Sequence, residues 1–180
     1  MRNNFLRKVE LHLRLFYSHW KNREKKILSS VCKGKGADIG CGSNKVSPNC
    51  IGIDITSKGT SGKYGCEKNK VSVSDYDASG DNLFMFKDNE LDFIVAKHNL
   101  EHYDNPVLTI QEWKRVLKKG GKIGVIVPDD KFVNTLKLDP THKYFFTLEK
   151  LTKLFKNQNF KILKKGIAIP HWSIYLIAQK

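Results

Sequence analysis

A glycine turn followed by a single acidic residue is the feature of this sequence that most directly indicates chemistry. The segment ADIGCG, from Ala37 to Gly42, has the apolar character of a strand that ends in a tight turn, and Asp54 follows in the next apolar segment, IGIDI. Glycines let the backbone approach a ligand closely, and a carboxylate at the end of the second strand can accept hydrogen bonds from both hydroxyls of a ribose. The pattern predicts a nucleoside-binding site.

The segment after the glycine turn indicates which nucleoside is bound. The third glycine of the dinucleotide motif G-x-G-x-x-G is missing, and Pro48 interrupts the short stretch from Ser43 to Cys50, which has room for about one helical turn. A dinucleotide needs a helix N-terminus for its pyrophosphate, whereas S-adenosylmethionine carries no phosphate. The sequence therefore favours S-adenosylmethionine over NAD.

Four further segments follow the glycine turn in the order of a known family. They are Leu91–Ala96 (LDFIVA), Asn99–His102 (NLEH), Glu112–Gly121 (EWKRVLKKGG) and Val125–Asp129 (VIVPD). They are similar to the fourth strand, the "LEH" segment, the "E-x-x-R-V-L-K-P-G-G" block and the end of the fifth strand in the class I S-adenosylmethionine-dependent methyltransferases. The sequence resembles this family over roughly residues 36 to 130, and it is most similar to small, type 11-like members.

The resemblance implies both the fold and the cofactor site. The expected fold is α/β, with a Rossmann-like, doubly wound, mostly parallel seven-stranded sheet whose last strand is antiparallel. In the family, the acidic and small residues that match Asp77 and Ala78 lie beside the adenine, although Asp75 could take this part, and either acid could simply form a turn. The cofactor-binding residues that the resemblance implies are Asp38, Gly40, Cys41, Gly42, Asp54, Ile55, Asp77, Ala78 and Lys97.

Methyl transfer asks for few catalytic side chains. The sulfonium is already an activated electrophile, so holding the acceptor in line with the methyl group supplies much of the acceleration. A general base is needed only if the acceptor must lose a proton, and the candidates by position are His98, His102, Asp129 and His142. Each of them could instead have a structural role. We select His98, because the end of the preceding strand faces the ligand cleft in this fold.

The segment His98–His102 also matches H-x-x-E-H, the inverted motif of some zinc proteases. Such a site needs both histidines on consecutive turns of one helix. Here His98 directly follows a predicted strand, and the next helix signal begins only at Asn105. We therefore expect no metal site.

The remaining elements are predicted from periodicity and from turn residues. Apolar residues recur every three or four positions from Phe5 to Val31, which indicates a basic amphipathic helical extension over residues 1–33. Its apolar face either packs on the domain, which we favour, or contacts a membrane surface. The other predictions are a short strand at 71–74, a helix from Asn105–Pro106 to Gly120–Gly121, a helix capped by Thr147, and strands at 160–169 and 173–179.

Composition limits the organisation of the chain. Its 180 residues, 40% of them hydrophobic, fit one methyltransferase domain at 34–180 after the extension. The four cysteines form no C-x-x-C pair, and no signal peptide or membrane-spanning run is present, so we expect reduced thiols and a cytoplasmic protein. The net charge of +14 comes mostly from scattered lysines, which favours a solvated basic surface over a dedicated polyanion site.

The acceptor is the least defined part of the prediction. The sequence lacks the Asn-Pro-Pro-Tyr segment and the cysteine that two kinds of nucleic-acid methyltransferase use. The acceptor pocket is expected from the N-terminal helix and residues 130–146, where Phe132, Tyr144, Phe145 and Phe146 could line it or belong to the core. We expect a small molecule, a sugar or a lipid-linked intermediate, since the short spacing from Gly42 to Asp54 is similar to family members associated with cell-surface glycan and lipid biosynthesis. RNA methylation and a non-catalytic nucleoside-binding module are the alternatives.

Overall fold

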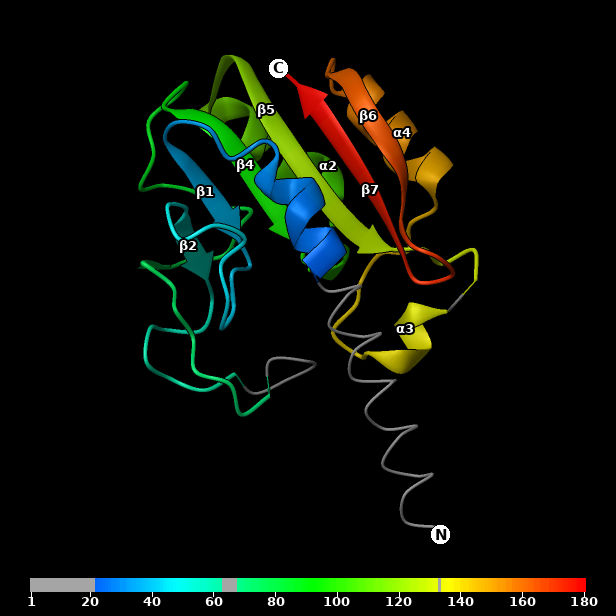
Figure 1. Ribbon diagram of the computed structural model, residues 1–180, viewed down its shortest axis with the longest axis horizontal. Helices are drawn as coiled ribbons and strands as arrows, with labels where there is room; N and C mark the ends of the chain where they lie inside the picture. Colours follow the sequence, from blue (N-terminus) through cyan, green and yellow to red (C-terminus); the bar gives the residue numbers. More distant parts are fainter. Residues whose placement is uncertain (1–21, 63–67, 133) are drawn as a thin grey trace, which may run out of the picture.

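The protein forms a mixed seven-stranded sheet in the order β3-β2-β1-β4-β5-β7-β6 (Figure 1). The computed structural model describes residues 22–62, 68–132 and 134–180. Strands β1 to β5 run parallel, whereas β7 is antiparallel to both of its neighbours. This confirms the predicted α/β fold. The strands are β1 (Gly36–Ile39), β2 (Ile51–Asp54), β3 (Tyr76–Asp77), β4 (Leu91–Lys97), β5 (Leu117–Pro128), β6 (Lys161–Ile169) and β7 (Ser173–Gln179).

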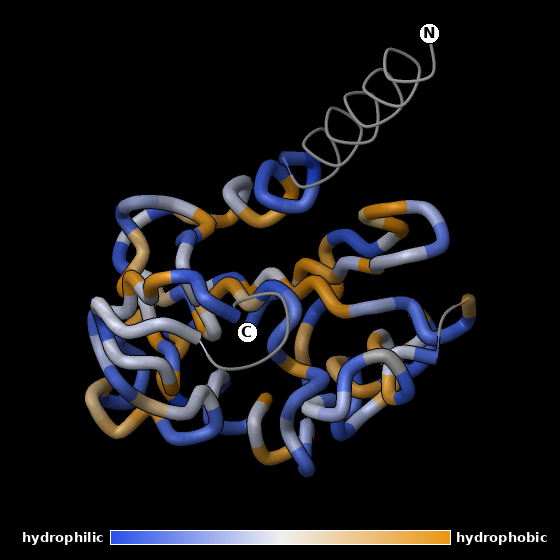
Figure 2. Tube along the Cα trace, turned by 90° about the horizontal axis from the view of Figure 1, so that it is seen from below, coloured by the Kyte–Doolittle hydropathy of each residue, from blue (hydrophilic) through white to orange (hydrophobic). Residues whose placement is uncertain are grey.

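Helices cover both faces of the sheet. On one face, α2 (Pro106–Val116) and α4 (Leu148–Asn157) pack against the strands, and on the other face lie the helical residues 22–29 (Figure 1). Apolar residues concentrate in the sheet between these layers, and polar residues lie mostly at the periphery (Figure 2). The larger core includes Trp113 and Phe155, and the smaller one includes Leu28 and Phe93. Within the described residues, no helix is long and apolar enough to cross a membrane.

The described part of the N-terminal extension packs on the sheet. Leu28 is fully buried and Val31 is 5% exposed. A Cβ added to Gly124 on β5 would lie 3.0 Å from Leu28 and 3.2 Å from Val31, so the glycine leaves the space that these side chains fill. The apolar stripe from Phe5 to Trp20 lies outside the described residues.

The helix α2 begins as predicted but ends earlier. Asn105 caps it by accepting hydrogen bonds from Val107 N and Leu108 N at 3.1 and 3.3 Å, with Pro106 at its first position. The prediction that Gly120–Gly121 ends this helix is wrong. The helix stops at Val116, and the glycines lie within β5. The pairing of β5 with β4 shifts between Leu117 and Lys122, so the glycines accommodate an irregularity of the strand, where Gly120 has a φ of 79°.

The short strand predicted at 71–74 is also displaced. β3 consists of Tyr76 and Asp77, which pair with Ile53 and Asp54 of β2. Val71 instead forms an isolated bridge with Ser61. Ser72 and Ser74 are buried, and they donate hydrogen bonds to the Thr60 and Thr56 carbonyls of the preceding loop instead of joining the sheet. The capped helix α4 and the closing strands β6 and β7 agree with their predictions.

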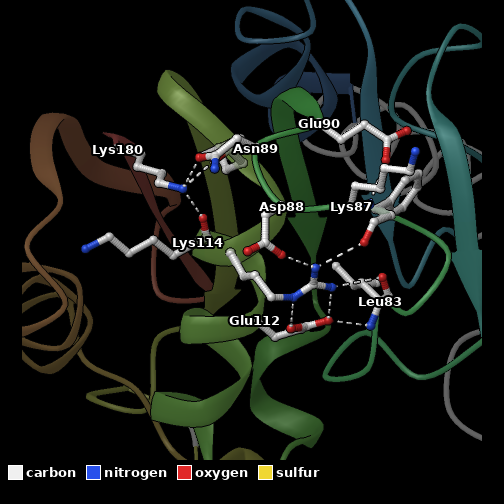
Figure 3. A network of polar contacts seen from close by, with 11 residues as sticks. Leu83, Lys87, Asp88, Asn89, Glu90, Glu112, Lys114 and Lys180 are labelled. Atoms are coloured by element: carbon white, nitrogen blue, oxygen red, sulfur yellow. Dashed lines mark hydrogen bonds and ion pairs between the residues drawn. The ribbon is translucent and has the colours of Figure 1, made fainter.

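Glu112 and Arg115, near the end of α2, form a polar network with the loop before β4 (Figure 3). The Arg115 guanidinium donates to both carboxylate oxygens of Glu112 at 2.8 Å and to Asp88 at 2.8 Å. It also donates to the carbonyl oxygens of Phe86 and Leu83, and Glu112 accepts from Leu83 N at 2.8 Å. The pair thus ties α2 to the loop before β4, which is a structural role.

Candidate active site

The loops after β1, β2, β3 and β4 meet at one edge of the sheet because these four strands are parallel neighbours. The glycine turn after β1 is held by Gly40 N and Cys41 N, which donate to the Ile53 carbonyl at 2.8 and 3.2 Å. Gly40 and Gly42 have φ values of 70° and 53°, a region that favours glycine. A Cβ on Gly40 would lie 2.3 Å from Asn99 Nδ2, so a side chain there would displace the segment after β4.

Asp54 lies at the end of β2, directly beside this turn. Its Oδ2 accepts a hydrogen bond from Gly42 N at 2.8 Å, and its Oδ1 accepts from Thr56 N at 2.8 Å. A carboxylate has about four lone-pair sites, so each oxygen can accept one more hydrogen bond. Ile55, the next residue, is 79% exposed and offers an apolar surface at the same place. The arrangement suits a ribose on the carboxylate with an apolar ring beside it.

Asp38, also predicted to bind the cofactor, lies at the end of β1 beneath the glycine turn. It is 1% exposed, and its Oδ2 accepts a hydrogen bond from Val46 N at 2.5 Å. Burial raises the pKa of Asp38 to about 7, against the effect of this hydrogen bond. The side chain holds residues 43–46 beneath the turn, so it shapes the site from behind.

Asp75 and Asp77, the two acids at β3, differ in their hydrogen-bond partners. Asp75 Oδ2 accepts from Gly52 N at 2.7 Å and from Lys45 Nζ. Although partial burial opposes it, the hydrogen bond from Lys45 lowers the pKa of Asp75. Asp77 is exposed, and its nearest hydrogen-bond donor is Ser74 Oγ at 3.4 Å, while Ala78 N donates to the Asp54 carbonyl at 3.0 Å. Asp77 and Ala78 therefore lie beside Asp54 with the Asp77 carboxylate accessible, whereas Asp75 is engaged.

His98 lies just beyond β4 and Lys97, between two carboxylates. Its Nε2 is 3.1 Å from Glu24 Oε1, and its Nδ1 is 3.7 Å from Glu101 Oε1. Ser173 Oγ also donates to Glu24 Oε1, at 2.6 Å. Burial disfavours the charged ring, but the contacts with Glu101 and Glu24 outweigh it and raise the pKa of His98 to about 9. A pKa in this range favours the imidazolium at neutral pH.

The other three predicted bases lie at the same edge. Asp129 follows β5 and is 6% exposed, with its Oδ1 accepting from Lys131 N at 3.2 Å. The rings of His102 and His142 contact each other with centroids 4.7 Å apart. Burial lowers the pKa of His142.

The aromatic residues expected near the acceptor divide into two groups. Phe146 is fully buried and belongs to the core. Phe132, Tyr144 and Phe145 are exposed by 48%, 38% and 45%. A groove of about 830 Å³ extends from Asp129 and Phe132 along α4 to β6 and β7.

Comparison with known proteins agrees with this geometry. A family model described as a methyltransferase domain matches residues 37–125, which include the glycine turn, Asp54 and the segment after β4. The sequence is also 32% identical to the uncharacterized protein MJ1123 of Methanocaldococcus jannaschii over 152 residues, which are 82% of this chain and 67% of the relative. The chain belongs to the class I S-adenosylmethionine-dependent methyltransferases. It is an enzyme, and its cofactor is S-adenosylmethionine.

Several solved structures share the fold. The YcgJ protein from Bacillus subtilis superposes with a TM-score of 0.65 at 16% identity, covering 89% of this chain and 98% of the other. A methyltransferase of Thermotoga maritima, described as a possible histamine N-methyltransferase, superposes with a TM-score of 0.63 at 19% identity, covering both chains completely. At these identities the likeness concerns the fold alone.

Sequence reasoning missed two residues of this site. Glu24 was visible only as one charge on an amphipathic helix, yet it is 4% exposed and contacts His98. Asn99 abuts Gly40 and accepts a hydrogen bond from Tyr103 Oη at 2.8 Å. A glutamate on the buried stripe of a basic helix was the available signal for Glu24, because a buried charge requires a partner.

Proposed function

We propose that this methyltransferase transfers the methyl group of S-adenosylmethionine to a small molecule, a sugar or a lipid-linked intermediate that carries a negative charge. The observation that supports it is the groove beyond the end of β5. Its volume of about 830 Å³ lies within the range of small-molecule sites. Four lysines, two acids (Asp129 and Glu149) and apolar side chains line it. The positive charges outnumber the negative ones, which suits a phosphate or carboxylate attached to a less polar body. The lysines are Lys131, Lys153, Lys156 and Lys165, and the apolar residues are Phe132, Leu148, Ile167 and Ile174.

The proposed cofactor site uses the turn after β1 and the ends of β2 and β3. Asp54 would accept hydrogen bonds from the ribose, Ile55 and Ala78 would border the adenine, and Asp77 would accept from its amino group. When bound, the cofactor supplies an electrophilic methyl group. Gly40, Cys41 and Gly42 would leave room for it because the turn presents little but backbone, while Asp38 holds the turn in place.

For His98, predicted as a general base, the proposed role is to orient the acceptor. With a pKa of about 9, the ring carries a proton at neutral pH. It would therefore orient an anionic or hydrogen-bond-accepting group of the acceptor, and it would act as a base only at alkaline pH. Lys97, at the end of β4, would add positive charge at the same place.

Turnover to S-adenosylhomocysteine tests the proposal. The purified enzyme is incubated with S-adenosylmethionine and a panel of phosphorylated sugars, lipid-linked intermediates, carboxylate metabolites and short RNAs. We expect turnover with a non-nucleic-acid acceptor and none with the Asp54→Ala variant. Turnover with RNA alone would establish the RNA methyltransferase alternative instead.

A pair of lysine variants tests the groove. Lys165 lines the groove from β6, whereas Lys161 at the start of the same strand does not. We expect Lys165→Ala to raise KM for the acceptor at least threefold and Lys161→Ala to leave it unchanged. Equal KM values in both variants would place the acceptor elsewhere.

A further inference from the structure

Glu101 is a buried carboxylate with no hydrogen-bond donor among the described residues. It lies in the short helix η2 (Leu100–His102) and is 1% exposed. In the part of the chain that the structure describes, neither Oε1 nor Oε2 has a hydrogen-bond partner. The nearest positive group is His98, whose Nδ1 is 3.7 Å from Oε1 and whose other ring nitrogen faces Glu24. A buried carboxylate without hydrogen bonds is unfavourable, so a further cation beside Glu101 would stabilise it.

Two histidines lie beside this carboxylate. His102 is the next residue, and His142 comes from the loop after α3 (Thr135–Leu138). Each of Glu101, His102 and His142 offers one possible metal-ligand atom, and these three atoms lie within 4.8 Å of one another. An ion with bonds of about 2.1 Å to nitrogen and oxygen holds its ligand atoms roughly 3 to 4.2 Å apart. A small contraction of these side chains would therefore complete the coordination.

The ring nitrogens are oriented as in ligating histidines. His102 Nδ1 lies 3.2 Å from the Thr141 carbonyl, where it can donate a proton, which leaves Nε2 with its lone pair. His142 has the opposite arrangement. Its Nε2 faces Asp139 Oδ2 at 4.0 Å, and its buried Nδ1 has no hydrogen-bond partner among the residues at 22–62, 68–132 and 134–180. A ligating histidine usually donates its second ring N–H to a carbonyl or a carboxylate, and both rings have such a group available.

The backbone holds the loop in this position. Lys143 N and Tyr144 N donate to the Glu101 carbonyl at 2.8 and 3.0 Å. Thr141 Oγ1 donates to Asp139 Oδ1 at 2.6 Å, which fixes the acid behind His142. The three candidate ligands are therefore brought together by main-chain contacts that do not depend on a metal.

We propose that Glu101, His102 and His142 bind one divalent transition-metal ion. Two neutral imidazoles and one carboxylate suit Zn²⁺, Mn²⁺, Fe²⁺ or Co²⁺, and three protein ligands leave positions open for water or a ligand oxygen. This replaces our expectation from the sequence that no metal is bound. The site differs from the H-x-x-E-H zinc motif, because His98 contacts Glu24 and does not take part.

The test measures metal binding directly. The full-length protein is stripped with a chelator and titrated with Co²⁺ and with Mn²⁺, using calorimetry and, for Co²⁺, visible absorption. Cys32 Sγ and Cys50 Sγ lie 3.9 Å apart and could bind a metal themselves, so the measurements use the Cys32→Ser background. We expect one ion per chain and a Co²⁺ spectrum without thiolate charge-transfer bands.

Two histidine variants and a stability measurement decide the assignment. His142→Ala should weaken binding at least tenfold, whereas His171→Ala, an exposed histidine outside the site, should leave it unchanged. The metal should raise the Tm of the parent protein and leave that of His142→Ala unchanged. No binding of either ion, or equal affinity in the His142→Ala variant, would overturn the proposal. Methyl transfer is not the readout, so the result is independent of the proposed function.

Discussion

Asp38 and Asp54 end neighbouring strands, yet their side chains have different surroundings. Asp38 is buried beneath the glycine turn and holds Val46, whereas Asp54 is half-buried and keeps lone pairs free beside the turn. Asp75 and Asp77 are both exposed, but Asp75 accepts from Gly52 N and Lys45 Nζ, whereas Asp77 accepts from Ser74 Oγ at 3.4 Å. Residue type and spacing therefore identify the acids of this site, but hydrogen-bond partners decide which of them can reach a ligand.

Replacement of Asp54 tests the ribose assignment. Asp54→Ala should raise the Kd for S-adenosylmethionine at least tenfold, about 1.4 kcal/mol, because hydrogen bonds to a charged group contribute about 1.5 to 3 kcal/mol each. Calorimetry measures the affinity, and circular dichroism verifies the fold. Asp104→Ala, at an aspartate whose side chain is 87% exposed, is the control and should bind normally. Undiminished affinity in Asp54→Ala would rule out the assignment.

The pKa of His98 should depend on Glu24. NMR titration of the wild-type protein should give a pKa of about 9, and Glu24→Gln should lower it, because one of the two flanking carboxylates is lost. If the pKa is unchanged in Glu24→Gln, Glu24 does not stabilise the imidazolium.

This titration also predicts how stability varies with pH. The folded pKa of His98 is above its ordinary value of 6.5, so its contribution is complete below pH 6.5 and is lost as the pH rises through about 9. Urea unfolding should show the free energy of unfolding falling over this interval. His98→Asn should flatten the profile, since asparagine tolerates the φ of 51° and does not titrate. An equally steep fall in that variant would contradict the prediction.

The helical residues 22–29 act as a structural layer of the domain. Leu28 and Val31 fill the space above Gly124, and Glu24 reaches the candidate active site. The helix thus joins the smaller core to His98. Packing of this helix on the sheet positions both the apolar side chains of the smaller core and the Glu24 carboxylate.

A cavity variant tests this docking. Leu28→Ala should lower the free energy of unfolding by about 2 to 5 kcal/mol, the range for truncating a fully buried leucine. Lys26→Ala, on the exposed side of the helix, should change it by less than about 0.5 kcal/mol. Denaturant unfolding measures both. A similarly small effect of Leu28→Ala would mean that the helix is not part of the folded unit.

Helix starts were predictable from the sequence where the capping residues themselves mark them. Asn105–Pro106 and Thr147 mark helix starts through their own side chains, and both helices begin there. The end of α2 was not predictable in this way, because residues after Val116 pair with β4, a partner distant in the sequence. For the same reason β3 lies at Tyr76–Asp77, where its pairing with β2 begins.

The charge of the whole molecule concerns its interactions with polyanions. With a net charge of +14, the protein should bind unrelated RNA sequences with similar affinity, and that affinity should fall steeply between about 50 and 200 mM salt. Fluorescence anisotropy with two unrelated RNAs measures this. Sequence discrimination that persists at the higher salt concentration would indicate a dedicated RNA site.

The candidate active site was predictable only in part. The turn and Asp54 lie within one short stretch of sequence, so their spacing was enough to predict that they lie side by side. The contact of Glu24 with His98 spans 74 residues, and His142 joins Glu101 through a loop whose path no local pattern specifies. Contacts of this kind depend on the assembled sheet.

The polar network of Glu112 and Arg115 has a consequence for comparisons between this protein and its relatives. It lies at the C-terminal end of α2, and since that helix runs back against the parallel strands, it is remote from the edge where Asp54 and His98 meet. Chains that retain this block share a scaffold, and they need not share an acceptor. A comparison of homologues by the compound they methylate should instead rely on the residues after β4 and β5, because these residues lie at the edge where the acceptor would bind.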